Sequence, residues 1–103
     1  MNTTEHVVKA PGDLNSETRV AFRDTALLAL EKLGEAPGSR LVIDLAETTR
    51  LDSAGLGMLV MLQLRAAERR VAISLRNVSE EVRFLLLMTR LEERFELEPR
   101  SER

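Results

Sequence analysis

Apolar residues along the chain follow two different periods, and the two kinds of segment alternate. Four short apolar runs have the length of strands, whereas the three longer segments between them repeat apolar residues at helical spacing. The predicted strands are EHVVKA (5–10), LVIDL (41–45), VAISL (71–75) and RFELE (94–98). The predicted helices span residues 16–33, 52–70 and 79–89. Such alternation is typical of an α/β fold with a largely parallel sheet.

Turn and cap residues separate these segments. Gly12 lies in the turn after the first strand, and Gly34 follows the last turn of the first helix, where glycine is favoured. Asp52 or Ser53 can cap the second helix, and Ser79 can cap the third. One apolar stripe of the first helix is expected to face the core: Phe22, Ala26, Ala29, Leu30 and Leu33.

The run LVIDL is apolar almost throughout, which predicts burial on both faces of the sheet. Right-handed crossovers place the carboxyl ends of the LVIDL and VAISL strands at the same edge of the sheet. In open α/β folds that edge usually carries the functional residues. The segment directly after LVIDL is therefore the first place to look for a site.

Length and composition indicate one domain. The chain has 103 residues without an internal repeat or a linker, so we predict a single domain over 1–103 with frayed ends at 1–4 and 99–103. Aromatic residues make up only 3%, so aliphatic side chains must form the core. The absence of cysteine excludes disulfides, thiol catalysis and zinc sites built on cysteine.

Charge and hydropathy narrow the classes of partner. A net charge of −2 gives no support to general nucleic-acid binding, which usually requires a basic surface. No apolar run approaches the ~18 residues of a membrane span, and the start MNTTEHVVKA does not resemble a signal peptide. We expect a cytoplasmic protein with no direct nucleic-acid contact and no membrane insertion. No Asp, Glu or His cluster has metal-ligand spacing, so neither a metal nor a cofactor is expected.

The stretch DSAGLG (52–57) combines an acid, a hydroxyl and two glycines, which suggests a functional site, but it does not match an enzyme active site. A nucleophilic serine needs a nearby base, and the only histidine is His6, on the first strand. The two glycines lack the third glycine of a dinucleotide fingerprint and the lysine of a P-loop. We therefore predict no catalytic residue and a non-enzymatic role. The purely structural alternative is that Asp52 or Ser53 caps the helix while the glycines permit a close approach.

The longer stretch LVIDLAETTRLDSAGLGML (41–59) resembles the signature of STAS domains, specifically bacterial anti-sigma factor antagonists. GDLN (12–15) is similar to the turn before the family's first helix, and VRFLLLMTRLEERFEL (82–97) to its closing helix and strand. The resemblance implies a STAS-like single domain. Its sheet would be mixed but mostly parallel, with four to five strands and helices packed on it, and its N-terminal strand hairpin would be shortened.

The resemblance also implies a function. Members of the family bind an anti-sigma factor, often a serine kinase, and thereby release a sigma factor. The kinase phosphorylates the serine after the motif's aspartate, which is Ser53 here, and phosphorylation switches the antagonist off. The implied partner-binding residues are Asn15, Asp52, Ser53, Ala54, Gly55 and Leu56. Two alternatives stay open: a STAS subunit that binds the ATPase of a lipid-trafficking ABC transporter, and a scaffold component of a stress-signalling assembly.

The chain departs from the family pattern in four places. Only one strand fits before Gly12, and Asn15 stands where many members have an aspartate linked to kinase contact. Ala54 replaces a frequent second hydroxyl, which leaves Ser53 as the acceptor. Arg90 replaces a usual glycine after the last helix, so we expect that helix to end differently.

Two apolar groups suggest contact surfaces. We expect Met58 and Met61 on the polar face of the second helix, where flexible methionines would form the floor of the partner site. The alternative is that a neighbouring helix covers them. On the last helix, Phe84, Leu87 and Leu91 lie away from the inward stripe and favour a homodimer or a second partner surface. Packing under the C-terminal tail is the alternative there.

Overall fold

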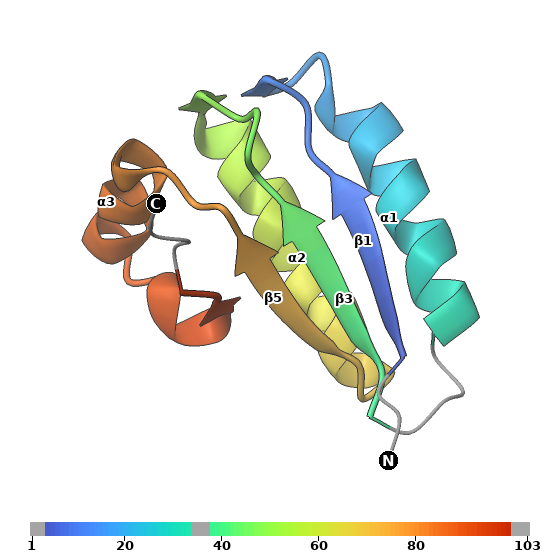
Figure 1. The fold of residues 1–103 in the computed structure, drawn as a ribbon. Coiled ribbons are helices and arrows are strands. Elements are labelled where there is room, and N and C mark those ends of the chain that lie inside the picture. Colours follow the sequence, from blue (N-terminus) through green and yellow to red (C-terminus); the bar gives the residue numbers. More distant parts are fainter. Residues whose placement is uncertain (1–3, 34–37, 100–103) are drawn as a thin grey trace.

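The computed structural model describes residues 4–33 and 38–99, in which three α-helices accompany a four-stranded sheet and a smaller two-stranded one (Figure 1). In chain order the elements are β1 (Glu5–Lys9), β2 (Asp13–Leu14), α1 (Arg19–Leu33), β3 (Arg40–Asp44), β4 (Arg50–Leu51), α2 (Ser53–Glu68), β5 (Ala72–Arg76), α3 (Glu80–Met88), a 3₁₀ turn (Glu92–Arg94) and β6 (Glu96–Leu97). The predicted α/β fold is confirmed.

The main sheet has the strand order β1-β3-β5-β6, and all its pairings are parallel. Each parallel step needs a crossover, which the three helices supply. The first helix begins at Arg19 rather than at residue 16, because Asn15 and Thr18 form a turn before it. The last strand is shorter than predicted, because a 3₁₀ turn occupies the residues before Glu96.

The hydrophobic core lies between one face of the sheet and the helices α1 and α2, which pack against each other and on the strands (Figure 1). The apolar stripe predicted for α1 is buried at all five positions. Leu41 and Ile43 of β3 point into this core and have no exposed surface. None of the described helices is both long and apolar enough to cross a membrane.

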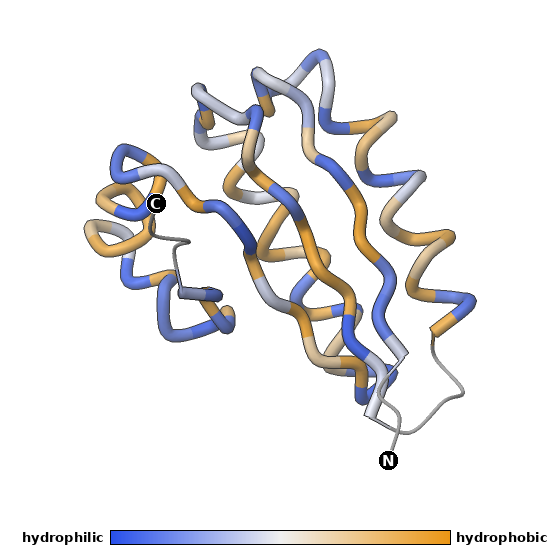
Figure 2. Tube along the Cα trace, in the orientation of Figure 1, coloured by the Kyte–Doolittle hydropathy of each residue, from blue (hydrophilic) through white to orange (hydrophobic). Residues whose placement is uncertain are grey.

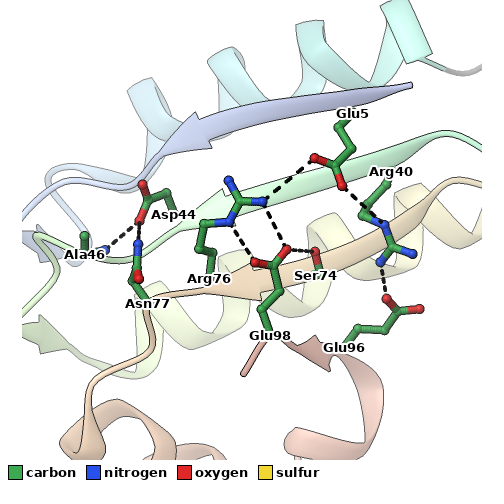
Figure 3. A network of polar contacts seen from close by, with 9 residues as sticks. All are labelled: Glu5, Arg40, Asp44, Ala46, Ser74, Arg76, Asn77, Glu96 and Glu98. Atoms are coloured by element: carbon green, nitrogen blue, oxygen red, sulfur yellow. Dashed lines mark hydrogen bonds and ion pairs between the residues drawn. The ribbon is translucent and has the colours of Figure 1, made fainter. Parts of the chain in front are cut away.

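The other face of the sheet carries a layer of alternating charges (Figure 3). The guanidinium of Arg76 donates to Glu98 (Nε to Oε1, 2.7 Å) and lies 3.8 Å from a carboxylate oxygen of Glu5. Arg40 pairs with Glu5 and with Glu96. Val42, the central residue of β3 on this face, is fully buried. Both faces of β3 are therefore covered, as predicted. The core covers one face, and the charged side chains with their apolar stems cover the other.

Two helices end on an arginine in the left-handed conformation. Arg70 (φ 60°) follows α2 and Arg90 (φ 61°) follows α3. After α3, the N–H of Leu91 donates to the carbonyl of Leu86 (2.8 Å), and that of Arg90 to Leu87 (3.1 Å), which is the usual glycine-type ending. The expectation that Arg90 makes the helix end differently was wrong. Gly34, the predicted end of the first helix, lies outside the described residues.

A short parallel pair, β2 with β4, fixes the start of α2 relative to the start of α1. The hydroxyl of Thr48 donates to the carbonyl of Pro11 (2.8 Å), and the N–H of Thr49 donates to the carbonyl of Gly12 (2.9 Å). The N–H of Asp52 reaches the carbonyl of Leu14 (3.4 Å). Segments far apart in the sequence therefore form one rigid edge beside the helix.

The two glycines of the motif have different environments. A Cβ atom on Gly55 would lie 2.2 Å from the carbonyl oxygen of Leu14, so only glycine lets the first turn of α2 pack there. A Cβ atom on Gly57 would meet no atom of residues 4–33 and 38–99 within 4 Å. Gly55 is thus required by the packing, whereas nothing in the described chain requires a glycine at position 57.

We predict opposite effects of alanine at these two positions. Gly55→Ala should lower the free energy of unfolding by about 1–3 kcal/mol, because a backbone oxygen cannot move aside as a side chain could. Gly57→Ala should raise it by up to about 1 kcal/mol, because alanine favours an exposed helix. Urea denaturation at neutral pH measures both. Equal stability of Gly55→Ala and the wild type would contradict the packing of α2 on Leu14.

The charge layer predicts a loss of stability in acid. The Arg76 guanidinium beside Glu98 lowers the pKa of that carboxyl from its ordinary 4.5. A depressed carboxyl pKa stabilises the fold above the unfolded value, and this stability is lost as the pH falls through the folded value. Glu98→Gln should cost ~1 kcal/mol at pH 7 and should flatten the decline of stability below pH 4.5. Arg76→Gln should remove the same pH-dependent part; an unchanged acid profile in both variants would refute the pairing.

Candidate functional site

Ser53 is the first residue of α2, and its side chain is exposed. The capping role belongs to its neighbour, since a carboxylate oxygen of Asp52 accepts a hydrogen bond from the N–H of Gly55 (3.0 Å). Within residues 4–33 and 38–99, the Ser53 hydroxyl makes no hydrogen bond. Of the two residues predicted as alternative caps, Asp52 takes the role, and Ser53 keeps a free and accessible hydroxyl.

Asn15 lies opposite this helix start, in the turn that leads into α1. Its side-chain oxygen accepts from the N–H groups of Glu17 (2.9 Å) and Thr18 (3.1 Å). The hydroxyl of Thr18 closes the turn by donating to the carbonyl of Asp13 (2.7 Å). An aspartate oxygen could accept the same two bonds, so asparagine keeps the turn and removes one negative charge.

The two segments together line a hollow of about 450 Å³. The residues around it bring Asn15 and Asp52 to one place, as the sequence predicted for this edge of the sheet. Two carboxylates and one guanidinium give it a slightly acidic polar wall, and its full lining is Asp13, Leu14, Asn15, Arg50, Leu51 and Asp52. We call this the switch hollow.

The expected exposure of Met58 was wrong, and Met61 is less exposed than expected. Met58 is only 5% exposed and belongs to the hydrophobic core, and Met61 is partly buried against it. Leu56 and Gly55 are also buried, and Ala54 is half-buried. Of the residues predicted on α2 as partner-binding, only Ser53 is fully accessible; Asp52, just before the helix, is exposed as well.

The exposed side of α2 continues from Ser53 through residues that the sequence reading missed. Gly57 lies one turn beyond Ser53 on the same side of the helix, and Leu64, 50% exposed, continues that side. The signal was present in the sequence, because positions 53, 57 and 64 lie opposite the buried Leu59 and Leu62 on a helical wheel. We call Ser53, Gly57 and Leu64 the α2 strip.

The geometry around Ser53 lacks a histidine. His6 is the second residue of β1, at the amino end of that strand, whereas α2 begins at the carboxyl edge of the sheet (Figure 1). Within the described parts of the chain, no group of three or more His, Asp or Glu residues could hold a metal ion. What the site presents chemically is an exposed hydroxyl beside one acidic cap.

The chain is similar to several known STAS proteins. A family profile described as "Mlab, STAS domain" matches residues 1–99. A STAS-domain-containing protein of Pseudomonas aeruginosa (strain UCBPP-PA14) is 36% identical over 93 residues, which cover 90% of this chain and 87% of that protein.

Solved structures share the fold. An anti-sigma-factor antagonist (STAS) domain protein from Planctomyces limnophilus superposes with a TM-score of 0.76 at 22% identity, covering 94% of this chain and 82% of that one. A sulfate transporter family protein from Wolinella succinogenes gives 0.63 at 16% identity, covering 92% and 75%. With the family profile matching almost the whole chain, this protein belongs to the STAS-domain family.

Proposed function

We propose that this chain is an anti-sigma factor antagonist that binds a serine-kinase anti-sigma factor and loses this binding when Ser53 is phosphorylated. The observation that carries the proposal is the division of roles at the start of α2. Asp52 caps the helix, so the Ser53 hydroxyl is both exposed and unused. A kinase can therefore reach the hydroxyl, and its modification breaks no contact of the fold.

Charge explains why phosphorylation would act on the complex rather than on the domain. A phosphate adds about −1.5 to −2 charges, and at a helix N-terminus this charge is favoured by roughly 0.3–1 kcal/mol. The carboxylate of Asp52 opposes it by a similar amount. In a docked interface, an unpaired charge costs about 2–5 kcal/mol, equivalent to roughly a 30- to several-thousand-fold loss of affinity.

The α2 strip supports docking at this place. Gly57 is exposed in the second turn of the helix, where glycine costs about 1 kcal/mol relative to alanine, and no neighbour among the described residues explains it. The missing side chain lets a partner approach the helix backbone next to Ser53. A partner that covers the strip also covers the hydroxyl that the switch modifies.

A second candidate function is a subunit of a transport complex. The structural likeness to a sulfate transporter family protein favours it, since that protein also contains this fold. In that case an ATPase or a transporter domain, not a kinase, would dock at the α2 strip.

We expect Ser53→Asp to weaken binding of the cognate anti-sigma factor at least about 30-fold, whereas Ser53→Ala should bind like the wild type. Each purified serine-kinase anti-sigma factor of the source organism is titrated calorimetrically with each variant. Thr25→Asp, which adds the same charge on the exposed side of α1, is the matched control.

With ATP, the kinase should add one phosphate to the wild type and none to Ser53→Ala.

Other outcomes would reject the switch. If Ser53→Asp bound as tightly as the wild type, or if the kinase left the wild type unmodified, phosphorylation would not regulate this protein. If no anti-sigma factor bound but a purified ABC ATPase did, the transport function would replace the antagonist function.

A bulky side chain at position 57 should block the partner without disturbing the fold. Gly57→Arg should weaken binding at least about tenfold, because the side chain fills the space that the glycine leaves open. Thermal unfolding should show unchanged or raised stability. Leu28→Arg, which places the same side chain at a position 59% exposed on α1, is the control that should bind normally. Normal binding by Gly57→Arg would place the interface elsewhere.

A further inference from the structure

Three large apolar side chains gather on the outer side of α3. Phe84, Leu87 and Met88 are 62%, 51% and 67% exposed, and their spacing places them next to one another on the helix. Figure 2 shows hydrophobic residues along α3, at the side of the sheet away from α1. Leu91, predicted with this group, instead packs against the core. Single exposed apolar residues are ordinary, whereas a cluster of three is a candidate contact surface.

A hollow of about 310 Å³ adjoins this cluster, between β4 and α3. Its walls are mainly apolar, and its lining is Thr49, Leu51, Glu81, Val82, Phe84 and Leu85. We call it the α3 groove. Its volume is near the lower limit of protein pockets, which suits one or two inserted side chains and not a whole helix.

The α3 groove and the switch hollow share one lining residue. Leu51 lines both, and it directly precedes Asp52 and Ser53 in the chain. A standard interface covers about 800 Å² on each partner, roughly an eighth of the 6547 Å² surface of the described structure. The α2 strip is too narrow for that area. A partner centred on Ser53 therefore has to extend over the adjoining surface, and the α3 groove provides an apolar part of it.

We propose that the anti-sigma factor that docks at Ser53 also inserts an apolar side chain into the α3 groove, against Leu51, Phe84 and Leu85. This inference rests on the proposed function. It assigns part of the binding affinity for the anti-sigma factor to the α3 groove. Glu81 at the rim makes no ion pair with any described residue. The inserted side chain is accordingly flanked by a lysine or an arginine of the partner, which pairs with Glu81.

The groove and the switch then have separate tasks. Apolar burial at Phe84 adds affinity that does not depend on the phosphorylation state, whereas Ser53 controls whether the two surfaces can meet. Energetic effects at two such sites are close to additive when the residues share no contact. Loss of the groove should thus lower affinity without abolishing the response to charge at position 53.

Phe84→Ala tests the groove in the full chain. We expect its dissociation constant for the purified anti-sigma factor kinase to rise about tenfold or more, with an unchanged melting temperature because Phe84 is exposed. Glu81→Lys should also weaken binding. Leu28→Ala, which removes a leucine 59% exposed on α1, is the matched control and should bind within twofold of the wild type.

The outcomes separate this inference from the proposed function. If Ser53→Asp weakens binding but Phe84→Ala does not, the groove is unused and the antagonist function stands. If the wild type binds no serine-kinase anti-sigma factor, both proposals fall. Light scattering over a concentration series tests a second copy as the occupant: a dimer that Phe84→Ala dissociates, with an unchanged dissociation constant for the kinase, would overturn the inference.

Discussion

The contact between the first turn of α2 and the carbonyl of Leu14 is the constraint on which the site depends. It brings the turn before α1 and the loop before α2 to backbone distance, and it is possible only because position 55 has no side chain. The pairing of β2 with β4 supports the same contact from the strand side. Without it, Asn15 and Ser53 would belong to two independent loops, and a partner could not recognise both as one surface.

This packing also explains how the charged and hydroxyl groups divide their tasks. Because α2 starts in a fixed position, the carboxylate of Asp52 is held at the N–H of Gly55 and satisfies the helix end. A cap on the preceding residue leaves the next side chain pointing to solvent. An acid followed by a serine therefore gives a helix start whose cap does not use the serine hydroxyl. Under the proposed function, phosphorylation of that hydroxyl would affect the docked partner and not the helix end.

Features set by local sequence could be predicted, and features set by distant contacts could not. The α/β order, the burial of the α1 stripe and the Ser79 cap follow from periodicity and capping, and the structure has them. The different roles of Gly55 and Gly57 depend on where Leu14 lies, which no local pattern reveals. Met58 was misplaced because it lies at the margin of the apolar arc of α2. The pairing of Arg40 with Glu5 of β1, and of Arg76 with Glu98 just after β6, joins segments far apart in the chain.

The arrangement of stabilising contacts bears on how the surface can evolve. The core lies on one face of the sheet and the charge layer on the other, so neither requires the residues exposed around Ser53 and on α3. Substitutions at Gly57, Glu81 or Phe84 therefore change little of the fold. Position 55, in contrast, has to stay glycine because its first helical turn packs on the carbonyl of Leu14. Under the proposed function, partner specificity can then diverge through the exposed positions while the position of Ser53 stays constant. Asn15 fits this scheme, because its side-chain oxygen keeps the turn. The absence of a charge at this position would also make the switch hollow less repulsive to the phosphate of the proposed switch.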